Sequence, residues 1–261
     1  MRYRLVDVFS SRPLAGNALC VVLDPCPEDR MQAVAREMNL SETTFLTSRG
    51  DGEYSMRIFT PGIELSFAGH PTLGTAWCMG PGRWRQRTSG AEVTVTVDAG
   101  GAEMIQPDPV ITAVDAGADA AAALGIGAVR GTWTAEAAGN RHVVVATEGS
   151  LSDWRIDATR ALALMDAQRT STIAVVERVD DTTLHVRVVF RANGVAEDPG
   201  TGSAAGPVAL VARELWDCAA DLVIHQGDEI GRPCRLRVHA ERGDLRVAGD
   251  VSLCAEGEFR F

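Results

Sequence analysis

Hydrophobic and polar residues alternate over short segments through most of the chain. Residues 92–97 (Glu-Val-Thr-Val-Thr-Val) place every second side chain on an apolar face, which predicts a β-strand. Residues 29–38 instead place apolar side chains three and four positions apart, which predicts an amphipathic helix. The same patterns predict further strands at 2–9, 19–23, 43–47, 54–59, 143–146, 173–177, 184–190, 222–224, 234–240, 244–248 and 251–254, and helices at 70–76, 118–124, 157–165 and 206–215. Many short strands with few helices indicate an α+β fold with mixed or antiparallel sheets.

The two halves of the chain repeat one local pattern. In the first half a strand ends at Phe59 and Gly69 opens a helix, and in the second half Phe190 and Gly202 hold the corresponding positions. The offsets are 131 and 133 residues, close to half of the 261-residue chain. This repeat predicts a duplicated fold with a functional site between two similar halves. We expect an N-terminal half at 1–112, a C-terminal half at 113–255, and a last strand at about 256–261 that can return to the first half.

Composition and charge exclude several classes of function. The formal net charge is −10, and an acidic protein repels phosphate backbones, so nucleic acid is not an expected partner. All 25 basic residues are Arg, which excludes a lysine-linked pyridoxal phosphate mechanism. The six Cys lack the spacing of zinc ligands, so we expect reduced thiols and no metal. No segment has the apolar length of a membrane helix or the apolar core of a signal peptide, which favours a cytoplasmic protein without membrane contact.

Two segments have the features of an anion-binding helix start. Each places a small, glycine-containing turn before a helix, with the sequences F-A-G-H-P-T at 67–72 and D-P-G-T-G-S-A at 198–204. The first N–H groups of a helix have no partner within it and carry a partial positive charge. Such groups bind a carboxylate or stabilise a developing oxyanion. Two of these starts would let a protein of net negative charge bind a small anionic metabolite.

A carboxylate and an imidazole beside these turns indicate acid–base chemistry. Glu42 lies in N-L-S-E-T-T-F (39–45), and His70 lies in the first of the two helix starts. Taken alone, each residue also has a structural explanation. Glu42 can be a solvated residue before a strand, and His70 can be the cap of a helix with proline in its first turn. Asp198 can open an ordinary turn and Ser203 can cap a helix. The residues by themselves therefore support a proton-transfer site and leave these alternatives open.

The motifs in combination resemble one known family, the phenazine-biosynthesis PhzF-like proteins. The resemblance rests on N-L-S-E-T-T-F (39–45), R-I-F-T-P (57–61), F-A-G-H-P-T-L-G-T-A (67–76), E-D-P-G-T-G-S-A (197–204) and Q-G-D-E-I-G-R-P (226–233). It covers the chain from residue 7 to about 255. It implies the fold of diaminopimelate epimerase, in which each of two similar halves is a curved sheet around a central helix and the site lies in the cleft between them. It also implies a homodimer, without cofactor or metal, that isomerises a conjugated amino-carboxylate such as trans-2,3-dihydro-3-hydroxyanthranilate.

The resemblance also implies roles for single residues. Glu42 matches the acid–base glutamate of the family, and His70 matches its supporting imidazole. Asp198 and Ser203 match an aspartate and a serine of the catalytic site. The positions that contact substrate match Ser41, Gly69 and Gly202. The resulting hypothesis is that Glu42 moves one proton between two carbons of an anionic substrate.

Departures from related patterns narrow this hypothesis. The related epimerases use two thiols, and Ala68 and Thr201 stand where those two Cys would be. Because neither side chain can act as a thiolate, a two-base racemisation is not expected. Ala18 and Ser66 stand where the PhzF-like pattern usually has proline, which loosens two turns without moving a catalytic atom.

Several alternatives remain open from the sequence. The substrate can be a dienoic amino acid, as in antibiotic pathways that make alkylated proline units. A non-catalytic binding or scaffold protein is a second alternative, because a fold does not guarantee a function. A cysteine-dependent epimerase is a third. A hydrolase using Ser203 is a fourth, although this serine lies outside a G-x-S-x-G motif.

Overall fold

The computed structural model describes residues 1–192 and 194–260, all but residue 153 with their side chains. The chain divides into two compact units. The first unit contains Met1–Gln106 and the C-terminal segment from Arg246, and the second unit contains Pro107–Leu245.

The segment that returns to the first unit is longer than the expected strand at 256–261, and the first unit ends before residue 112. Backbone pairing explains this difference. Strand β17 (Asp244–Gly249) pairs with β8 (Gly101–Ile105), and β18 (Val251–Glu258) pairs with β1 (Arg2–Val8). Two successive strands near the C-terminus are therefore held by ladder hydrogen bonds to the first unit.

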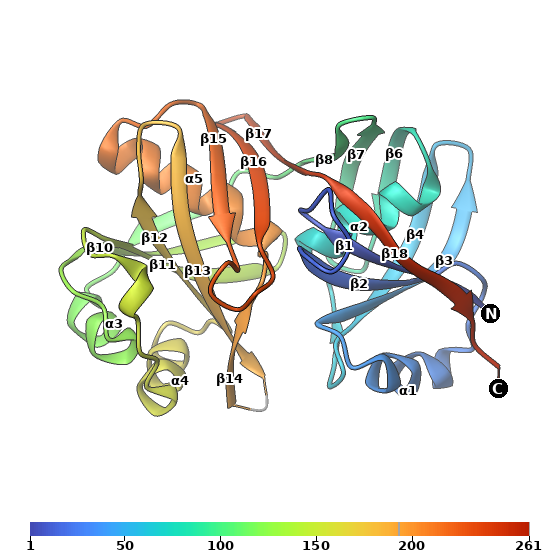
Figure 1. The fold of residues 1–261 in the computed structure, drawn as a ribbon, viewed down its shortest axis with the longest axis horizontal. Coiled ribbons are helices and arrows are strands. Elements are labelled where there is room, and N and C mark those ends of the chain that lie inside the picture. Colours follow the sequence, from blue (N-terminus) through green and yellow to red (C-terminus); the bar gives the residue numbers. More distant parts are fainter. Residues whose placement is uncertain (193, 261) are drawn as a thin grey trace. The chain divides into compact units, whose positions relative to one another are not determined.

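The first unit is a curved mixed sheet around one helix (Figure 1). Besides β1, β8 and β18, its strands are β2 (Asn17–Val22), β3 (Glu42–Gly50), β4 (Glu53–Phe59), β5 (Glu64–Leu65), β6 (Gly82–Arg87) and β7 (Glu92–Asp98). The enclosed helix α2 (Gly69–Met79) contacts β1, β2, β3, β6, β7, β8 and β18, and all its residues except Trp77 are buried. Helix α1 (Glu28–Met38) packs Met31, Val34 and Ala35 into a separate cluster outside this sheet.

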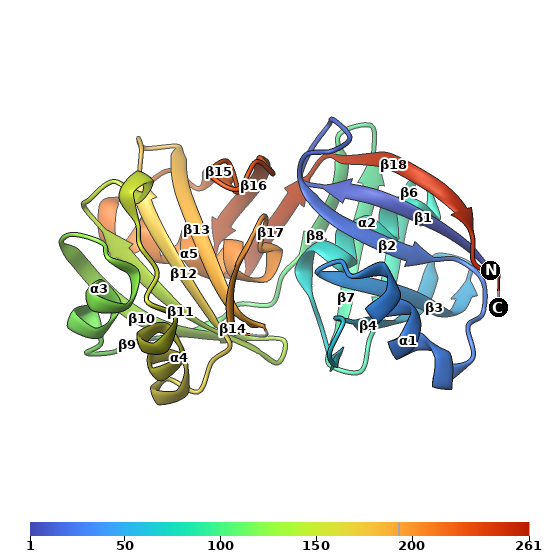
Figure 2. The same ribbon diagram turned by 60° about the horizontal axis from the view of Figure 1, so that its bottom comes forward.

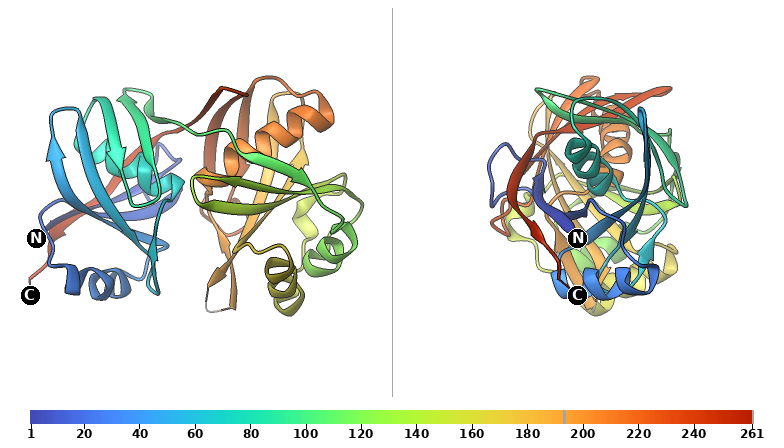
Figure 3. Two further views of the ribbon diagram at one scale, coloured as in Figure 1. Left: turned by 180° about the vertical axis from the view of Figure 1, so that it is seen from behind. Right: turned by 90° about the vertical axis from the view of Figure 1, so that its right-hand side faces the viewer.

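The second unit has the same design (Figures 2 and 3). Its strands are β9 (Val110–Ala113), β10 (Val129–Ala137), β11 (Asn140–Thr147), β12 (Thr172–Arg178), β13 (Thr183–Ala192), β14 (Gly194–Asp198), β15 (Asp221–Gln226) and β16 (Cys234–Glu241). Helix α5 (Gly202–Trp216) packs against β11, β12 and β16. Helices α3 (Gly117–Leu124) and α4 (Ala158–Ala167), with a 3-10 turn at Leu151–Asp153, pack on alternate residues of β11 and β12.

The two units repeat one order of strand pairing. In the first unit, β1 and β2 pair antiparallel, and β2 and β3 pair parallel with α1 between them in sequence. The next pairs, β3–β4 and β4–β5, are antiparallel. Strand β6 follows α2 and pairs parallel with β4. The second unit repeats these relations in the same order around α4 and α5. Its pairs are β10–β11, β11–β12, β12–β13, β13–β14 and β13–β15. Gly69 and Gly202 both open the helix that follows the short hairpin. The predicted α+β fold with two similar halves is confirmed.

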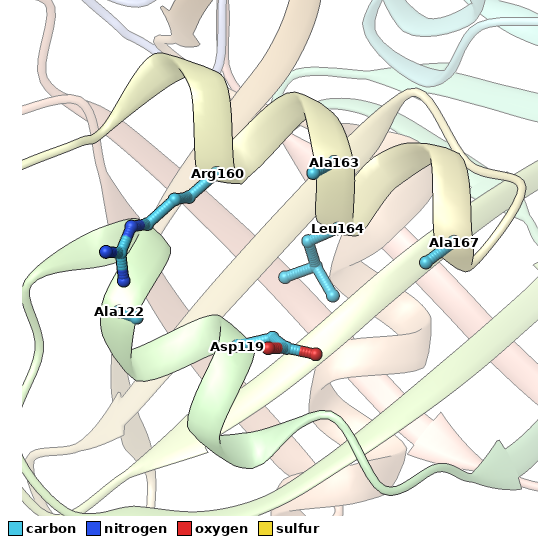
Figure 4. A pocket seen from close by; sticks show the side chains of 6 residues that line it. All are labelled: Asp119, Ala122, Arg160, Ala163, Leu164 and Ala167. Carbon is cyan, nitrogen blue, oxygen red and sulfur yellow. The ribbon is translucent and has the colours of Figure 1, made fainter.

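A pocket of about 440 Å³ lies between α3 and α4 (Figure 4). Its lining is Asp119, Ala122, Arg160, Ala163, Leu164 and Ala167. Asp119 and Arg160 are exposed, so the pocket holds no shielded acid–base pair, and none of the predicted site residues lines it. In the described part of the chain, no helix is both long and apolar enough to cross a membrane.

Candidate functional site

Glu42 and His70 lie together in the first unit. Glu42 is the first residue of β3, and His70 is the second residue of α2. Helix α2 lies close to β1 and β2, since a Cβ added to Gly74 would lie 2.6 Å from Leu19 Cδ2 and 2.8 Å from Val8 Cγ2. This close packing seats the helix start beside β3, where His70 Nε2 lies 3.3 Å from Glu42 Oε2. The predicted carboxylate–imidazole pair is therefore present in the fold.

Both side chains of this pair are shielded from water, with 4% of His70 and 16% of Glu42 exposed. Burial lowers the pKa of His70 to about 3, against an opposing effect of a hydrogen bond with the Ala18 backbone. The imidazole is therefore neutral at pH 7. A neutral imidazole nitrogen can donate to a carboxylate or accept from a carboxylic acid, depending on its tautomer. This partner accommodates both protonation states of Glu42.

Asn17 links this pair to Ser41. The Asn17 side chain is fully buried, its Nδ2 lies 3.2 Å from His70 Nδ1, and the Ser41 hydroxyl donates to its Oδ1 at 3.4 Å. Because an amide nitrogen only donates, this contact favours the imidazole tautomer that carries its proton on Nε2. Gly16 makes the turn before Asn17 with φ 71°, and an added Cβ would lie 2.4 Å from a backbone oxygen of β1.

Gly69 begins α2 directly before His70. Ala68, the residue before it, has extended backbone with φ −151° and provides no side-chain cap. The Thr72 N–H donates to the Ala68 carbonyl at 3.3 Å, and Pro71 has no N–H. The N–H groups of Gly69 and His70 thus precede the hydrogen-bond ladder of the helix, as an anion-binding helix start requires.

Asp198 and α5 form the corresponding site in the second unit. Strand β14 ends at Asp198, and the Thr201 hydroxyl donates to Asp198 Oδ2 at 2.5 Å. The Thr201 carbonyl accepts the first ladder bonds of α5 from Ala204 and Ala205, each at 3.1 Å. The structure therefore places the Asp198 carboxylate at the start of α5.

Gly202 and Ser203 are the first two residues of α5, before the ladder of the helix begins. Gly202 is buried and Ser203 is half-buried. Thr201, the residue before them, makes no side-chain cap to this helix because its hydroxyl is directed to Asp198. The predicted residues of the second unit thus lie within one short turn.

Gln226 fixes this turn from the neighbouring strand. Its side chain is buried, and its Oε1 accepts a hydrogen bond from the Thr201 N–H at 3.2 Å. Its Nε2 donates to the Asp198 carbonyl at 2.8 Å and to the Thr201 hydroxyl oxygen at 3.1 Å. Sequence reasoning had noted the Q-G pair without giving it a role. Gln226 shares one structural feature with Asn17, because each is a buried amide side chain beside a glycine of positive φ. The sequence alone does not distinguish such a pair from an exposed turn.

The positions expected for thiols in a cysteine-dependent epimerase are equivalent in the two units. Ala68 immediately precedes α2, and Thr201 immediately precedes α5. Burial raises the pKa of Cys20 and of Cys78 to about 12, so these two thiols are protonated at neutral pH. Within residues 1–192 and 194–260, no group of three or more His, Cys, Asp and Glu side chains is placed to hold a metal ion.

Comparison with known sequences gives one consistent result over nearly the whole chain. The model of the family described as phenazine biosynthesis-like protein (PhzC-PhzF) matches residues 6–257. The trans-2,3-dihydro-3-hydroxyanthranilate isomerase of Pseudomonas aeruginosa is 37% identical, over 98% of this chain and 98% of its own. An uncharacterized isomerase of Mesorhizobium japonicum is 33% identical, over 98% of this chain and 97% of its own.

Solved structures show the same fold. A phenazine biosynthesis protein of the PhzF family from Enterococcus faecalis has a TM-score of 0.85 at 24% identity, covering 100% of this chain and 99% of its own. A Pseudomonas aeruginosa protein described as a predicted epimerase has a TM-score of 0.84 at 31% identity, covering 99% and 98%. A hydroxyproline epimerase from Agrobacterium vitis has a TM-score of 0.60 at 12% identity, covering 98% and 91%. The fold is therefore shared with amino-acid epimerases.

Proposed function

Since this chain belongs to the phenazine biosynthesis-like (PhzC-PhzF) family, we propose that it is an isomerase that transfers a proton within its substrate without a cofactor. The observation that carries the proposal is the Glu42 carboxylate at 3.3 Å from the buried, neutral imidazole of His70. The names of the isomerase relatives support the same reaction class.

In the proposed step, Glu42 acts first as base and then as acid. Its carboxylate removes a proton from one carbon of a conjugated substrate, and the electrons of that C–H bond move into the π-system. The carboxylic acid so formed returns the proton to another carbon of the same system, which leaves the enzyme unchanged and the substrate isomerised. Throughout the step the buried His70 imidazole, with Nε2 at 3.3 Å from Glu42 Oε2, stays beside the carboxyl group and limits its orientation.

The helix starts supply the groups that hold the substrate in this proposal. The backbone N–H groups at Gly69 and His70, or those at Gly202 and Ser203, bind its carboxylate, because each pair precedes the hydrogen-bond ladder of its helix. Asp198 binds its amine or hydroxyl group. Ser41, beside Glu42, contacts the substrate through a hydroxyl that reaches Asn17.

The substrate class that fits these groups is a conjugated amino-carboxylate. The Pseudomonas relatives take their name from trans-2,3-dihydro-3-hydroxyanthranilate, and 37% identity over nearly the full length supports a substrate of this kind here. A dienoic amino acid offers the same carboxylate, amine and conjugated carbons. The two differ in whether the diene belongs to a ring.

Proton NMR in deuterated water tests the function and the substrate together. We expect the protein to convert trans-2,3-dihydro-3-hydroxyanthranilate. Deuterium should appear at the carbon that receives the proton, in the fraction of turnovers in which the proton held by Glu42 exchanges with solvent before it is returned. Conversion of a dienoic amino acid in its place would assign the other substrate. Binding of either compound without conversion or exchange would indicate a non-catalytic binding protein and overturn the proposal.

The assembly and compartment form a separate part of the proposal. We expect a homodimer because of the family resemblance. We expect a cytoplasmic protein because the six cysteines are free thiols in the structure. Light scattering after gel filtration should give the mass of two chains. A monomer at micromolar concentration would contradict the dimer without affecting the proposed chemistry.

A further inference from the structure

Gln226 and Gly227, the Q-G pair of the motif at 226–233, have no role in the proposed proton transfer. We propose that Gln226 and Gly227 are a positioning device that fixes the Asp198 carboxylate and the first turn of α5. The catalytic part of this inference rests on the proposed function, because it assumes that Asp198 and the start of α5 bind the substrate.

The amide of Gln226 directs both its oxygen and its nitrogen to this turn. One oxygen and one nitrogen make three hydrogen bonds of 2.8–3.2 Å to Asp198 and Thr201, and only 2% of the residue is exposed. An apolar side chain of the same length would leave the Asp198 carbonyl and the Thr201 N–H without this partner. Loss of a partner for a buried polar group is more costly than the hydrogen bond itself is stabilising.

The same amide sets the direction of the Thr201 hydroxyl. Because Gln226 Nε2 donates to Thr201 Oγ1 at 3.1 Å, that oxygen serves as an acceptor on this side. Its own proton is then directed to Asp198 Oδ2 at 2.5 Å. Gln226 therefore orients Asp198 twice, through its backbone carbonyl and through Thr201.

Gly227 allows the next turn of the chain to approach the same loop. It has φ 83°, and an added Cβ would lie 2.6 Å from the Pro199 carbonyl oxygen and 2.5 Å from the Arg232 carbonyl oxygen. The Arg232 N–H donates to the Gly227 carbonyl at 2.9 Å, which closes the turn. Any side chain at residue 227 would push against the residue that follows Asp198.

An ion-pair network holds the segment after Gly227 and the strand before Asp198. Glu229 lies 2.8 Å from His185 Nε2. Arg187, which is 7% exposed, makes two bonds of 2.7 and 2.8 Å to Glu197, the residue before Asp198. Bidentate pairs of this kind fix geometry as well as charge. The motif at 226–233 thus contacts the Asp198 loop from the strand and from the turn.

Two glycine variants test the proposal with matched backbone strain. Gly227 and Gly243 have φ of 83° and 84°, but nothing lies within 4 Å of a Cβ built on Gly243. We expect Gly227→Ala to raise amide hydrogen exchange in residues 198–205 at least tenfold and to lower kcat about 10- to 100-fold, as misplacement of a binding group does. We expect Gly243→Ala to leave both unchanged. Equal effects of the two substitutions would overturn the proposal.

A second pair of variants removes polar groups without adding a Cβ. Gln226→Met deletes the three bonds to the loop, whereas Thr132→Val deletes buried bonds to Val114 and Ala116 elsewhere in the second unit. We expect faster exchange in residues 198–205 and a lower kcat only for Gln226→Met. Unchanged exchange in that variant would overturn the positioning role. The exchange readout needs no substrate, so absence of isomerase activity in the wild-type protein would reject the proposed function and leave this test valid.

Discussion

At the residue scale, the candidate site depends on a few buried polar side chains, and the sequence predicted only some of them. His70 and Asp198 could be selected because they lie in the two motifs with glycine-led helix starts, and Glu42 because N-L-S-E-T-T-F (39–45) resembles a motif of the family. Asn17 and Gln226 could not, because an amide beside a glycine is typical of any exposed turn. Both are instead buried and contact residues more than 20 positions away in sequence, and burial of this kind is a property of the tertiary structure.

Buried histidines predict how stability depends on pH. Burial lowers the pKa of His70 to about 3 and that of His142 to about 4, from 6.5. The unfolded chain therefore binds more protons than the folded protein between these values and 6.5, and stability falls as the pH falls through this range. At about 1.4 kcal/mol per pKa unit, His142 alone accounts for up to about 3 kcal/mol of this loss.

The substitution His142→Leu should make the protein less sensitive to acid. In the described residues neither ring nitrogen of His142 has a hydrogen-bond partner, so an apolar side chain removes an unfavourable burial as well as a titrating group. Urea unfolding at pH 7 and pH 4.5 should show a smaller difference in the free energy of unfolding for the variant. An unchanged difference would show that His142 does not titrate in this way.

At the scale of elements, the patterns predicted many of the strands but missed β6, β8, β9 and β10, of which β6 and β9 are the most exposed. Residues 92–97 alternate clearly and form β7, whereas β9 is almost entirely exposed and β6 buries only Gln86, so neither shows an apolar face in its sequence. Helix α5 begins at Gly202, as the repeat predicts, whereas the hydrophobic pattern alone predicts a start at 206, because the first turns are buried small residues without a polar face. Such elements are specified by their neighbours.

Helix α2 gives a prediction that belongs to this scale. Gly74→Ala would place a methyl group 2.6 Å from Leu19 and 2.8 Å from Val8, which are both fully buried, and should cost about 1–3 kcal/mol. It should also move His70 away from Glu42 and lower kcat. Gly117→Ala, at the first position of α3, meets nothing closer than 3.5 Å and should not destabilise the protein. Thermal unfolding of both variants checks these opposite expectations, and equal stability would contradict the packing argument.

At the scale of the whole molecule, the sequence predicted the duplication better than the boundaries. The echo between Gly69 and Gly202 was sufficient because both glycines open an enclosed helix at the same point of a repeated topology. The extent of the returning C-terminal segment was underestimated, because pairing of β17 with β8 leaves no mark in the local pattern.

The most direct test of the central claim compares two Glu→Gln substitutions in similar surroundings. Glu42 lies 3.3 Å from His70 in the proposed site, and Glu177 lies 3.2 Å from His185 in the ion-pair network of the second unit. Turnover of the converted substrate should fall by about 10²- to 10⁴-fold in Glu42→Gln, which is the usual contribution of a positioned acid–base group. It should stay within a few-fold of wild type in Glu177→Gln. Near wild-type turnover in Glu42→Gln, with the variant folded, would contradict the claim that Glu42 carries the proton.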